Sequence, residues 1–281
     1  MVLKQNDNPC RIWGQAGLPE GQGRPRLPAM GFEPSAVRLA ARLLREAQRA
    51  WALTGAGVST PSGIPDFRGP QGLWRTHNPE EVSTIEGFLR NPQAFYAFWL
   101  WRFQSMSQAQ PNPVHRFLAA LEARGFLKGV ITQNIDGLHQ RAGSRRVLEV
   151  HGHVRSASCL SCGAKYPMGW VAEEVERTGL ARCSCGDLVK PDVVLFGEPL
   201  TPDFEVAQRE VAEADLLFVL GTSLTVWPVA GLVPWAASRG ARLIIANAEP
   251  TPYDPYADVL LRGDLVETCT LLARALEVDL A

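Results

Sequence analysis

A short apolar segment that ends in a glycine-rich turn constrains this chain more than any other feature. Residues 50–53 are apolar, and Thr54-Gly55-Ala56-Gly57 follows directly. A buried parallel strand of an α/β sheet typically ends in this way, in a loop whose backbone can approach a phosphate group. Gly55 and Gly57 are expected to provide either a positive φ or space for a ligand. The stretch therefore predicts a nucleotide-binding loop at the carboxyl end of a strand.

The loop differs from the dinucleotide fingerprint of the dehydrogenases. That fingerprint needs a third glycine three residues after the second, and Thr60 stands there instead. The prolines that follow cannot continue a helix smoothly, so the loop is long. It carries Asp66, Phe67 and Arg68 side by side. An acid, an aromatic ring and a guanidinium next to a phosphate site indicate chemistry performed on a nucleotide.

Helical periodicity alternates with short apolar runs along most of the chain. Helices are predicted at 35–49, 92–104, 113–125, 135–142, 203–214, 228–238 and 265–276, and strands at 50–53, 127–132, 147–150, 193–196, 216–220, 243–246 and 258–261. Strands that alternate with helices predict an α/β fold with a doubly wound, parallel, Rossmann-like sheet.

Two insertions are expected to interrupt this sheet. The Rossmann-like domain would comprise residues 32–65, 113–151 and 193–281, and residues 66–112 would form a cofactor loop and a helical insert. The aromatic residues of 92–104 are interpreted as the core of that insert. Residues 152–192 would form a small zinc-ribbon domain. Residues 1–31 are rich in Gly, Pro, Gln and Asn without periodicity, which predicts a disordered tail.

Four cysteines occur as two closely spaced pairs. Cys159-x2-Cys162 and Cys183-x-Cys185 are each followed by a glycine, which lets a turn direct backbone N–H groups at sulfur. Two disulfides or four idle thiols are the alternatives, but disulfides are disfavoured inside cells and such pairs favour tetrahedral zinc. Four protein ligands leave no position for water, so the zinc would be structural. The second pair is one residue shorter than Cys-x2-Cys, so its geometry is expected to be less regular.

Charge and hydropathy narrow the possible partners. The formal charge is −1, from 28 Lys+Arg and 29 Asp+Glu, which gives no general reason to expect nucleic-acid binding. The N-terminus has no secretory signal. The longest apolar run, 226–237, contains two prolines and is too short to span a bilayer. A cytoplasmic location without membrane attachment is expected.

Polar groups follow several predicted strands, at the edge where open α/β sheets bind ligands. His151 follows 147–150, and 133–136 (Gln-Asn-Ile-Asp) follows 127–132. His151 is therefore a catalytic candidate, whereas helix capping by Asn134 or Asp136 is the alternative for the second group. His139 is interpreted as a packed structural histidine, and His115 as solvated or capping.

Taken in order, these segments resemble the sirtuins, the NAD-dependent protein deacylases. The resemblance rests on GAGVSTPSGIPDFRG (55–69), TQNIDGLHQRAG (132–143), EVHG (149–152), CLSCG (159–163), LVKPDVVLFGE (188–198), LGTSL (220–224) and ANAEP (246–250). It covers the chain from about Pro34 to the C-terminus.

The resemblance implies an NAD-dependent protein-lysine deacylase, a deacetylase above all, that releases nicotinamide and O-acyl-ADP-ribose. A mono-ADP-ribosyltransferase or a long-chain deacylase of the same fold is the alternative. The implied partners are acylated-lysine proteins or peptides, with no specific nucleic acid and no membrane; a monomer is favoured. From other classes, a nicotinamide dehydrogenase is disfavoured by the missing glycine, and a nucleic-acid-binding zinc ribbon by the neutral charge.

The resemblance also implies roles for individual residues. His151 would be the general base, with Asn134 and Asp136 beside it in the catalytic centre. The residues implied to bind NAD are Gly55, Ala56, Gly57, Ser59, Ile64, Asp66, Phe67, Arg68, Trp74, Gln133, Asn134, Ile135, Asp136, Gly221, Thr222, Ser223, Asn247, Glu249 and Leu265. Val194, Phe196, Gly197 and Glu198 would bind the peptide by strand addition. Cys159, Cys162, Cys183 and Cys185 would hold the zinc.

One departure from the family pattern concerns the acyl group. Sirtuins that remove acidic acyl chains carry Tyr-x-x-Arg on the helix that matches 95–102. Here Tyr96 is present, but Trp99 replaces the arginine. An indole cannot neutralise a carboxylate, and a buried unpaired charge is costly. We therefore expect acetyl or longer apolar acyl groups to be preferred over succinyl or malonyl groups.

Overall fold

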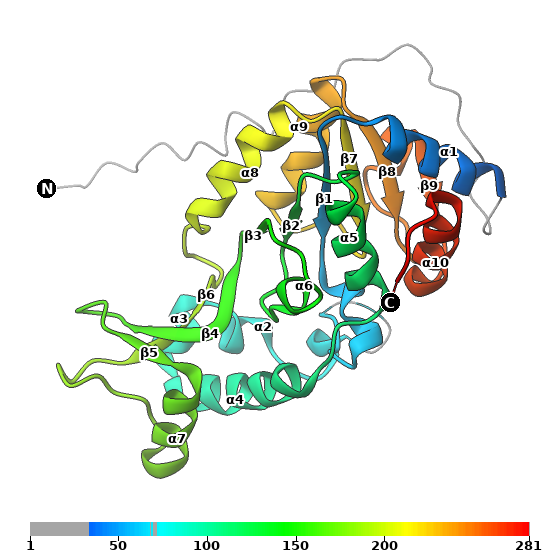
Figure 1. Cartoon of the computed structure of the whole chain (residues 1–281). Helices are drawn as coiled ribbons and strands as arrows, with labels where there is room; N and C mark the ends of the chain where they lie inside the picture. The colour runs from blue at the N-terminus through cyan, green and yellow to red at the C-terminus, as the bar shows by residue number, and fades with distance from the viewer. Residues whose placement is uncertain (1–33, 68, 70–71, 281) are drawn as a thin grey trace, which may run out of the picture.

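A six-stranded parallel sheet forms the centre of the molecule (Figure 1). The computed structural model describes residues 34–67, 69 and 72–280, so the predicted tail at 1–31 and Arg68 lie outside the described residues. The strand order is β3-β2-β1-β7-β8-β9, and every neighbouring pair is parallel. The strands are β1 (Ala50–Thr54), β2 (Val130–Thr132), β3 (Val147–Glu149), β7 (Leu216–Leu220), β8 (Arg242–Ala246) and β9 (Val259–Leu261). The predicted doubly wound α/β fold is confirmed.

Helices cover both faces of this sheet. α1 (Pro34–Glu46), α5 (Pro113–Ala123) and α10 (Leu265–Leu276) share one hydrophobic core with one face, whereas α8 (Pro202–Ala212) and α9 (Leu232–Ser238) cover the other. Successive side chains of a strand point to opposite faces. Ala50 and Ala52 accordingly pack in the first core, and Trp51 and Leu53 in the second. Burial on both faces explains why β1 is apolar almost throughout.

The two insertions share a third core. The helical insert contains α2 (Pro79–Val82), α3 (Ile85–Arg90) and α4 (Pro92–Gln108). The cysteine-containing insert has an antiparallel sheet of order β5-β4-β6, formed by β4 (Gly152–Cys159), β5 (Lys165–Pro167) and β6 (Val189–Val193), and α7 (Met168–Thr178). Aromatic residues of α4 pack against α7 and β6, and Tyr96 Oη donates a hydrogen bond to Val189 O at 2.7 Å. The aromatic helix thus joins both insertions.

The remaining elements are single turns. They are α6 (Leu138–Arg141) and the 3₁₀ turns η2 (Ala56–Val58), η3 (Thr60–Ser62), η4 (Leu73–Arg75), η5 (Val229–Gly231) and η6 (Asp254–Tyr256). Among the residues that the structure describes, no helix is both long and apolar enough to cross a membrane.

Two sequence predictions about elements are wrong. Residues 193–196 do not form a strand of the large sheet, because β6 ends at Val193 and pairs antiparallel with β4. The helix predicted at 135–142 is limited to α6, since Gly137 adopts a left-handed φ of 72° and Asp136 Oδ1 accepts a hydrogen bond from Leu138 N at 2.9 Å. The residues before α6 therefore form a loop.

Candidate active site and metal centre

A cavity of about 990 Å³ opens at the carboxyl ends of the strands of the large sheet. It lies beside β1 and β7, where the strand order reverses and where open α/β sheets bind their ligands. Every predicted active-site residue that the structure describes lines it: Gly55, Ala56, Gly57, Ser59, Ile64, Asp66, Phe67, Trp74, Gln133, Asn134, Ile135, Asp136, His151, Val194, Phe196, Gly197, Glu198, Gly221, Thr222, Ser223, Asn247, Glu249 and Leu265. Arg68 lies outside the described residues.

Because Gly55 and Gly57 lack side chains, the segments that follow β1 and β7 can pack closely against each other. A Cβ on Gly55 would lie 2.7 Å from Thr222 Cβ, and one on Gly57 would lie 2.9 Å from Gly221 Cα. Gly57 N donates a hydrogen bond to Gly221 O at 2.9 Å. Neither Gly55 nor Gly57 has a positive φ, whereas Gly221 has one of 58°. Of the two expected roles, neither glycine takes a positive φ, and the space that a side chain would need is occupied by the segment that follows β7.

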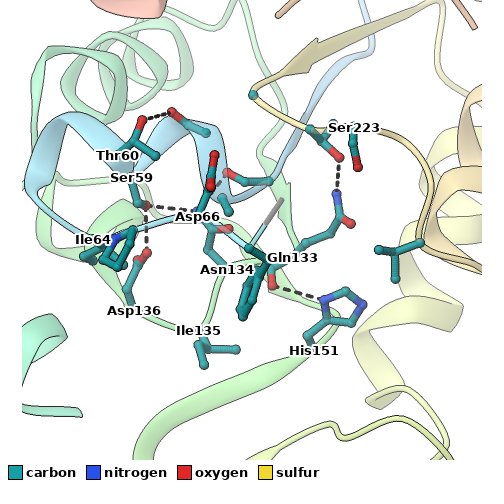
Figure 2. A pocket seen from close by; sticks show the side chains of 18 of the residues that line it. Ser59, Thr60, Ile64, Asp66, Gln133, Asn134, Ile135, Asp136, His151 and Ser223 are labelled. Carbon is teal, nitrogen blue, oxygen red and sulfur yellow. Dashed lines mark hydrogen bonds between the residues drawn. The ribbon is translucent and has the colours of Figure 1, made fainter. Parts of the chain in front are cut away.

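The His151 ring is held by the backbone (Figure 2). Nδ1 lies 3.1 Å from Gln133 O. A carbonyl oxygen can only accept, so Nδ1 carries the proton and Nε2 keeps its lone pair. Burial lowers the pKa of His151 below its ordinary value, and the hydrogen bond to Gln133 offsets this only in part. A neutral imidazole with a free Nε2 can accept a proton near neutral pH.

Asn134, Ser59 and Asp136 form a second hydrogen-bonded group (Figure 2). Asn134 Nδ2 donates to Gly55 O and to Ser59 Oγ, both at 3.0 Å. Ser59 Oγ donates to Asp136 Oδ2 at 2.7 Å. Burial raises the pKa of Asp136 above its ordinary value, against hydrogen bonds to Leu138 and Ser59 that favour the carboxylate. Asp136 precedes Gly137, the N-cap of α6, and its Oδ1 accepts from Leu138 N, so a contact with the helix start and a place in the cavity coexist.

His115 extends this group, although its sequence position suggested only a solvated or capping residue. Asn112 N donates to His115 Nδ1 at 3.3 Å, so the ring proton is on Nε2, which faces Ser59 Oγ at 3.4 Å. The side chain is fully buried rather than solvated. His115 thus caps α5 and, through its other nitrogen, orients the hydroxyl that contacts Asp136. The Asn112-Pro113 sequence before His115 is typical of a helix start and agrees with the cap of α5. No local pattern in the sequence indicated the contact between His115 and Ser59.

Arg102 is the second residue that the sequence interpretation missed. It lies one helical turn after Trp99 on α4, is only 3% exposed and lines the same cavity. Its Nη1 donates to Pro65 O at 3.0 Å, and its guanidinium carbon lies 5.2 Å from the centre of the Phe67 ring. Trp99 Nε1 donates to Val82 O instead. Arg102 thus places a cation on this helix that the sequence interpretation did not consider, whereas Trp99 holds the position of the arginine in the acidic-acyl pattern. The expected preference for acetyl or longer apolar acyl groups stays a prediction.

The predicted peptide segment is partly paired already. Val194 N donates to His151 O at 2.9 Å. Phe196 pairs with the segment that joins α2 and α3, since its N donates to Ser83 O and its O accepts from Ile85 N. Strand addition through the backbone of Phe196 is therefore blocked. The Phe196 ring, 50% exposed, lines the cavity together with Trp227, which is 53% exposed.

The loop after β8 is shaped by its own side chains. Asn247 Nδ2 donates to Glu249 O at 2.7 Å, and Arg262 Nη1 donates to the carbonyl oxygens of both residues at 3.1 Å. The amide of Asn247 thus holds the loop, while the Glu249 side chain is exposed at the edge of the cavity.

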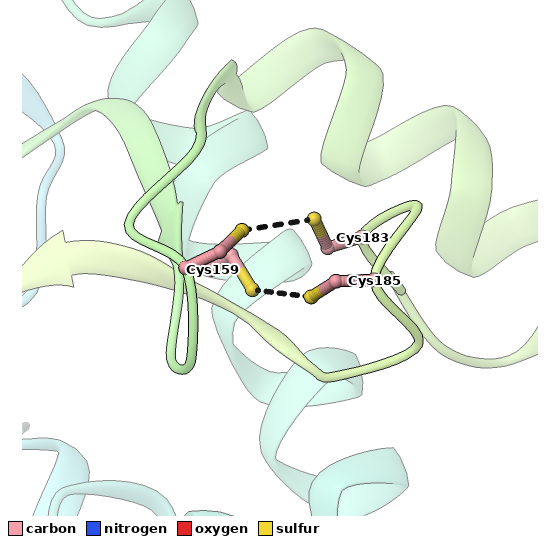
Figure 3. Close-up of side chains that lie close together, drawn as sticks. Cys159, Cys183 and Cys185 are labelled. Carbon is pink, nitrogen blue, oxygen red and sulfur yellow. Dashed lines mark hydrogen bonds between the residues drawn. The ribbon is translucent and has the colours of Figure 1, made fainter.

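The four paired cysteines converge on one point (Figure 3). Their Sγ atoms all lie within 4.8 Å of one another, with Cys159 3.4 Å from Cys185 and Cys162 3.5 Å from Cys183. Zinc–sulfur bonds of about 2.3 Å in a tetrahedron place sulfurs about 3.8 Å apart, so the cluster fits zinc. The thiols are free rather than joined in disulfides. With four thiolate ligands the site is suited to a structural ion.

Comparisons with known proteins identify the family. The model of the Sir2 family matches residues 55–228. A Sulfolobus acidocaldarius protein named NAD-dependent protein deacetylase is 50% identical over 224 residues, which cover 79% of this chain and 88% of that protein. An Archaeoglobus fulgidus protein named NAD-dependent protein deacylase 2 is 49% identical over 231 residues, covering 81% and 90%.

Solved structures agree with the sequence matches. A Sir2 structure with a deacetylated p53 peptide and 3′-O-acetyl ADP-ribose superimposes with a TM-score of 0.84 at 38% identity, covering 86% of this chain and 99% of the other. A Sir2–p53 peptide–NAD⁺ structure gives a TM-score of 0.78 at 40% identity, covering 84% and 96%. The predicted resemblance is confirmed: the chain belongs to the Sir2 family.

Proposed function

We propose that this protein is an NAD-dependent protein-lysine deacetylase in which His151 is the general base. The observation that carries the proposal is one cavity that holds both the glycine loop after β1 and a neutral His151 with its Nε2 unprotonated. The names of the Sulfolobus and Archaeoglobus relatives, and the peptide and acetyl ADP-ribose in the Sir2 structures, support the same activity.

The cavity fits a dinucleotide in size and in chemistry. Its volume of about 990 Å³ lies at the upper end of the usual range for small-molecule sites, about 300–1,000 Å³. It also extends past the ends of β1, β2, β7 and β8, so an extended ligand can contact several strand ends at once. We assign Gly55–Gly57 and Gly221–Ser223 to the phosphates and adenosine, and Asn247 and Glu249 to ribose hydroxyls.

The protein's own groups have distinct tasks in this scheme. NAD, when bound, would supply an electrophilic ribose carbon and nicotinamide as its leaving group. His151 Nε2 takes a proton from a hydroxyl group in the cavity, while the bond from Nδ1 to Gln133 O keeps the ring in the required tautomer. The side chains of Asn134 and Asp136, oriented through Ser59, bind the nicotinamide side. Phe67, which contacts Trp74 at 4.9 Å between ring centres, excludes water there.

We assign the acyl-lysine peptide to the part of the cavity between residues 194–198 and the loop before Pro228. Because the backbone of Phe196 is already paired with Ser83 and Ile85, and the N–H group of Val194 with His151 O, the peptide would pair with the backbone groups of 194–197 that remain. The exposed rings of Phe196 and Trp227 would then flank the lysine chain.

Replacement of the general base tests this function. His151→Ala should lower the rate of NAD-dependent deacetylation of an acetyl-lysine peptide by about 10²–10⁴-fold, the usual contribution of a positioned acid–base group. Deacetylated peptide and nicotinamide are measured by mass spectrometry, and NAD binding by calorimetry, which should be unchanged. His77→Ala is the control, because His77 lies outside the cavity lining.

Two outcomes would contradict the assignment. Deacetylation retained in His151→Ala would remove His151 from the chemistry. Label from the adenylate half of NAD accumulating on protein, without deacetylated peptide, would favour the ADP-ribosyltransferase alternative.

A further inference from the structure

The Phe67 ring is held in the cavity by contacts to two other segments. Its centre lies 4.9 Å from that of Trp74, and the guanidinium carbon of Arg102 lies 5.2 Å from the same ring centre. Within about 6 Å a cation is attracted to the face of an aromatic ring. Trp74 belongs to η4, a few residues further along the chain, whereas Arg102 belongs to α4 of the helical insert. The position of the ring therefore depends on an element outside its own loop.

Arg102 also binds the backbone of this loop. Its Nη1 donates a hydrogen bond to Pro65 O at 3.0 Å. The carbonyl oxygens of the next two residues accept hydrogen bonds from Leu73 N and Trp74 N, at 3.0 and 3.1 Å. Residues 65–67 are thus bound by α4 at one end and by η4 at the other.

Stability alone does not explain a guanidinium at this place. Arg102 is only 3% exposed, and its Nε is buried without a hydrogen-bond partner among the described residues. A buried charge with incomplete hydrogen bonding costs free energy. Burial lowers the pKa of Arg102 to about 10, which still leaves the side chain charged at pH 7. Exceptions of this kind are typical of functional sites, and Arg102 lines the cavity assigned to NAD.

We propose that Arg102 is a positioning residue that keeps the Phe67 ring in the cavity, where the ring excludes water from the electrophilic ribose carbon of NAD. This role rests on the proposed function, in which Phe67 shields the reacting centre. Water that reaches the ribose carbon would form a bond to it as the bond to nicotinamide breaks. The products would be ADP-ribose, nicotinamide and a proton, and the lysine would stay acylated. Arg102 thus determines what fraction of the NAD consumed leads to deacetylation.

Arg102→Met tests the proposal, because it removes the charge and the donor but keeps a long apolar side chain. The full-length wild type and the variant are incubated with NAD and an acetyl-lysine peptide, and nicotinamide and deacetylated peptide are measured by mass spectrometry. The nicotinamide released in excess of deacetylated peptide should rise about 10-fold, since a cation–π contact and a charged hydrogen bond are both lost. An excess equal to that of the wild type, in a variant that still deacetylates, would overturn the proposal.

Hydrogen exchange of the ligand-free protein gives a readout that needs no NAD. The N–H groups of Leu73 and Trp74 are bonded to the carbonyl oxygens of Asp66 and Phe67, so their exchange reports whether the loop is held. Arg102→Met should make both exchange about 10-fold faster, while exchange in β1 stays the same. Unchanged exchange at these two amides would overturn the proposal even if the excess of nicotinamide rises. If the wild type deacetylates no peptide, the proposed function fails, and the exchange rates still decide whether Arg102 holds the loop.

Arg141→Met is the matched control. Arg141 also binds a loop through its guanidinium, with Nη1 donating to Ala109 O at 2.7 Å and Nη2 donating to Gln110 Oε1 at 2.9 Å. It lies outside the cavity lining. This variant should keep the wild-type excess of nicotinamide and the wild-type exchange rates of the two amides. A change as large as that of Arg102→Met would show that the effect is not specific to the contact with Phe67.

A double-mutant cycle tests whether Arg102 acts through Phe67. Phe67→Leu should by itself raise the excess of nicotinamide, because a smaller side chain shields the ribose carbon less. In that background Arg102→Met should add little. An additional effect of undiminished size would mean that Arg102 controls water access without the ring, which overturns the proposal. A Phe67→Leu variant without excess nicotinamide would remove the shielding role from the proposed function, and the role of Arg102 with it.

Discussion

At the scale of single residues, the site is defined by which nitrogen of each histidine carries the proton. His151 and His115 show opposite tautomers, because His151 Nδ1 faces a carbonyl oxygen whereas His115 Nδ1 accepts from a backbone N–H. The first tautomer leaves a free Nε2 at the cavity, and the second directs an Nε2–H at Ser59. One imidazole is therefore arranged to accept a proton and the other to orient a hydroxyl.

The pH profile of the enzyme should reflect the burial of His151. The base is active when neutral, so activity is lost as pH falls through its pKa, which burial lowers from the ordinary value of about 6.5. We expect the acid limb of kcat/KM to have its midpoint below 6.5. Initial rates between pH 5 and 8, with His77→Ala as the control, measure it; a midpoint above 7 would contradict the assignment.

At the scale of elements, the cofactor loop depends on the segment that follows another strand. The segments after β1 and β7 pack so closely that side chains are excluded from Gly57 and Gly221. The proposed phosphate site is thus formed by the segments that follow two parallel strands. Gln133, at the end of β2, adds a hydrogen bond from its Nε2 to Thr222 Oγ1 at 3.0 Å. A substitution that displaces the backbone of one segment is therefore expected to displace the other.

Gly57→Ala should separate these two segments. The new methyl would lie 2.9 Å from Gly221 Cα, and backbone atoms must move to accommodate it. We expect a loss of about 1–3 kcal/mol in the free energy of unfolding, the usual cost of overpacking, together with weaker NAD binding. Gly169→Ala is the control, since a Cβ there meets nothing within 4 Å. Urea unfolding and NAD titration of both variants make the comparison; equal behaviour would refute the packing argument.

At the scale of the whole molecule, two histidines are sealed between the layers. His115 and His139 are almost completely buried, with 4.9 Å between ring centres, and His139 Nε2 lies 3.0 Å from Thr54 Oγ1 of β1. Burial lowers the pKa of His115 to about 4 and that of His139 well below its ordinary value. Both are neutral in the folded protein at pH 7. They therefore couple folding to proton binding.

Acid should destabilise the protein through this pair. Below about pH 6.5 the unfolded chain binds protons that the folded protein excludes, so stability is lost as pH falls toward 4. Each histidine contributes a slope of about 1.4 kcal/mol per pH unit in that window. Urea unfolding at several pH values should show a smaller slope for His139→Leu than for the wild type. An unchanged slope would mean that His139 is protonated in the folded state.

The sequence by itself determined the fold class and much of the cavity lining. β7 and α10 begin and end where the apolar pattern predicts, because burial of a strand on two faces and of a helix on one is encoded by local periodicity. The carboxyl ends of parallel strands lie at the same edge of a sheet, independent of the conformation of the loops that follow them. His151 and Gln133 could therefore be predicted to lie near Gly55.

Only the tertiary structure decided which groups contact one another across the chain. His115 reaches Ser59, Arg102 reaches Pro65, Phe196 pairs with Ser83, and Tyr166 reaches Cys183. Val193, which was predicted to begin a strand of the large sheet, likewise pairs with Gly152 of β4. Periodicity records which face of an element is buried, but a hydrogen bond between distant segments depends on how whole elements pack, and this packing leaves no local trace in the sequence.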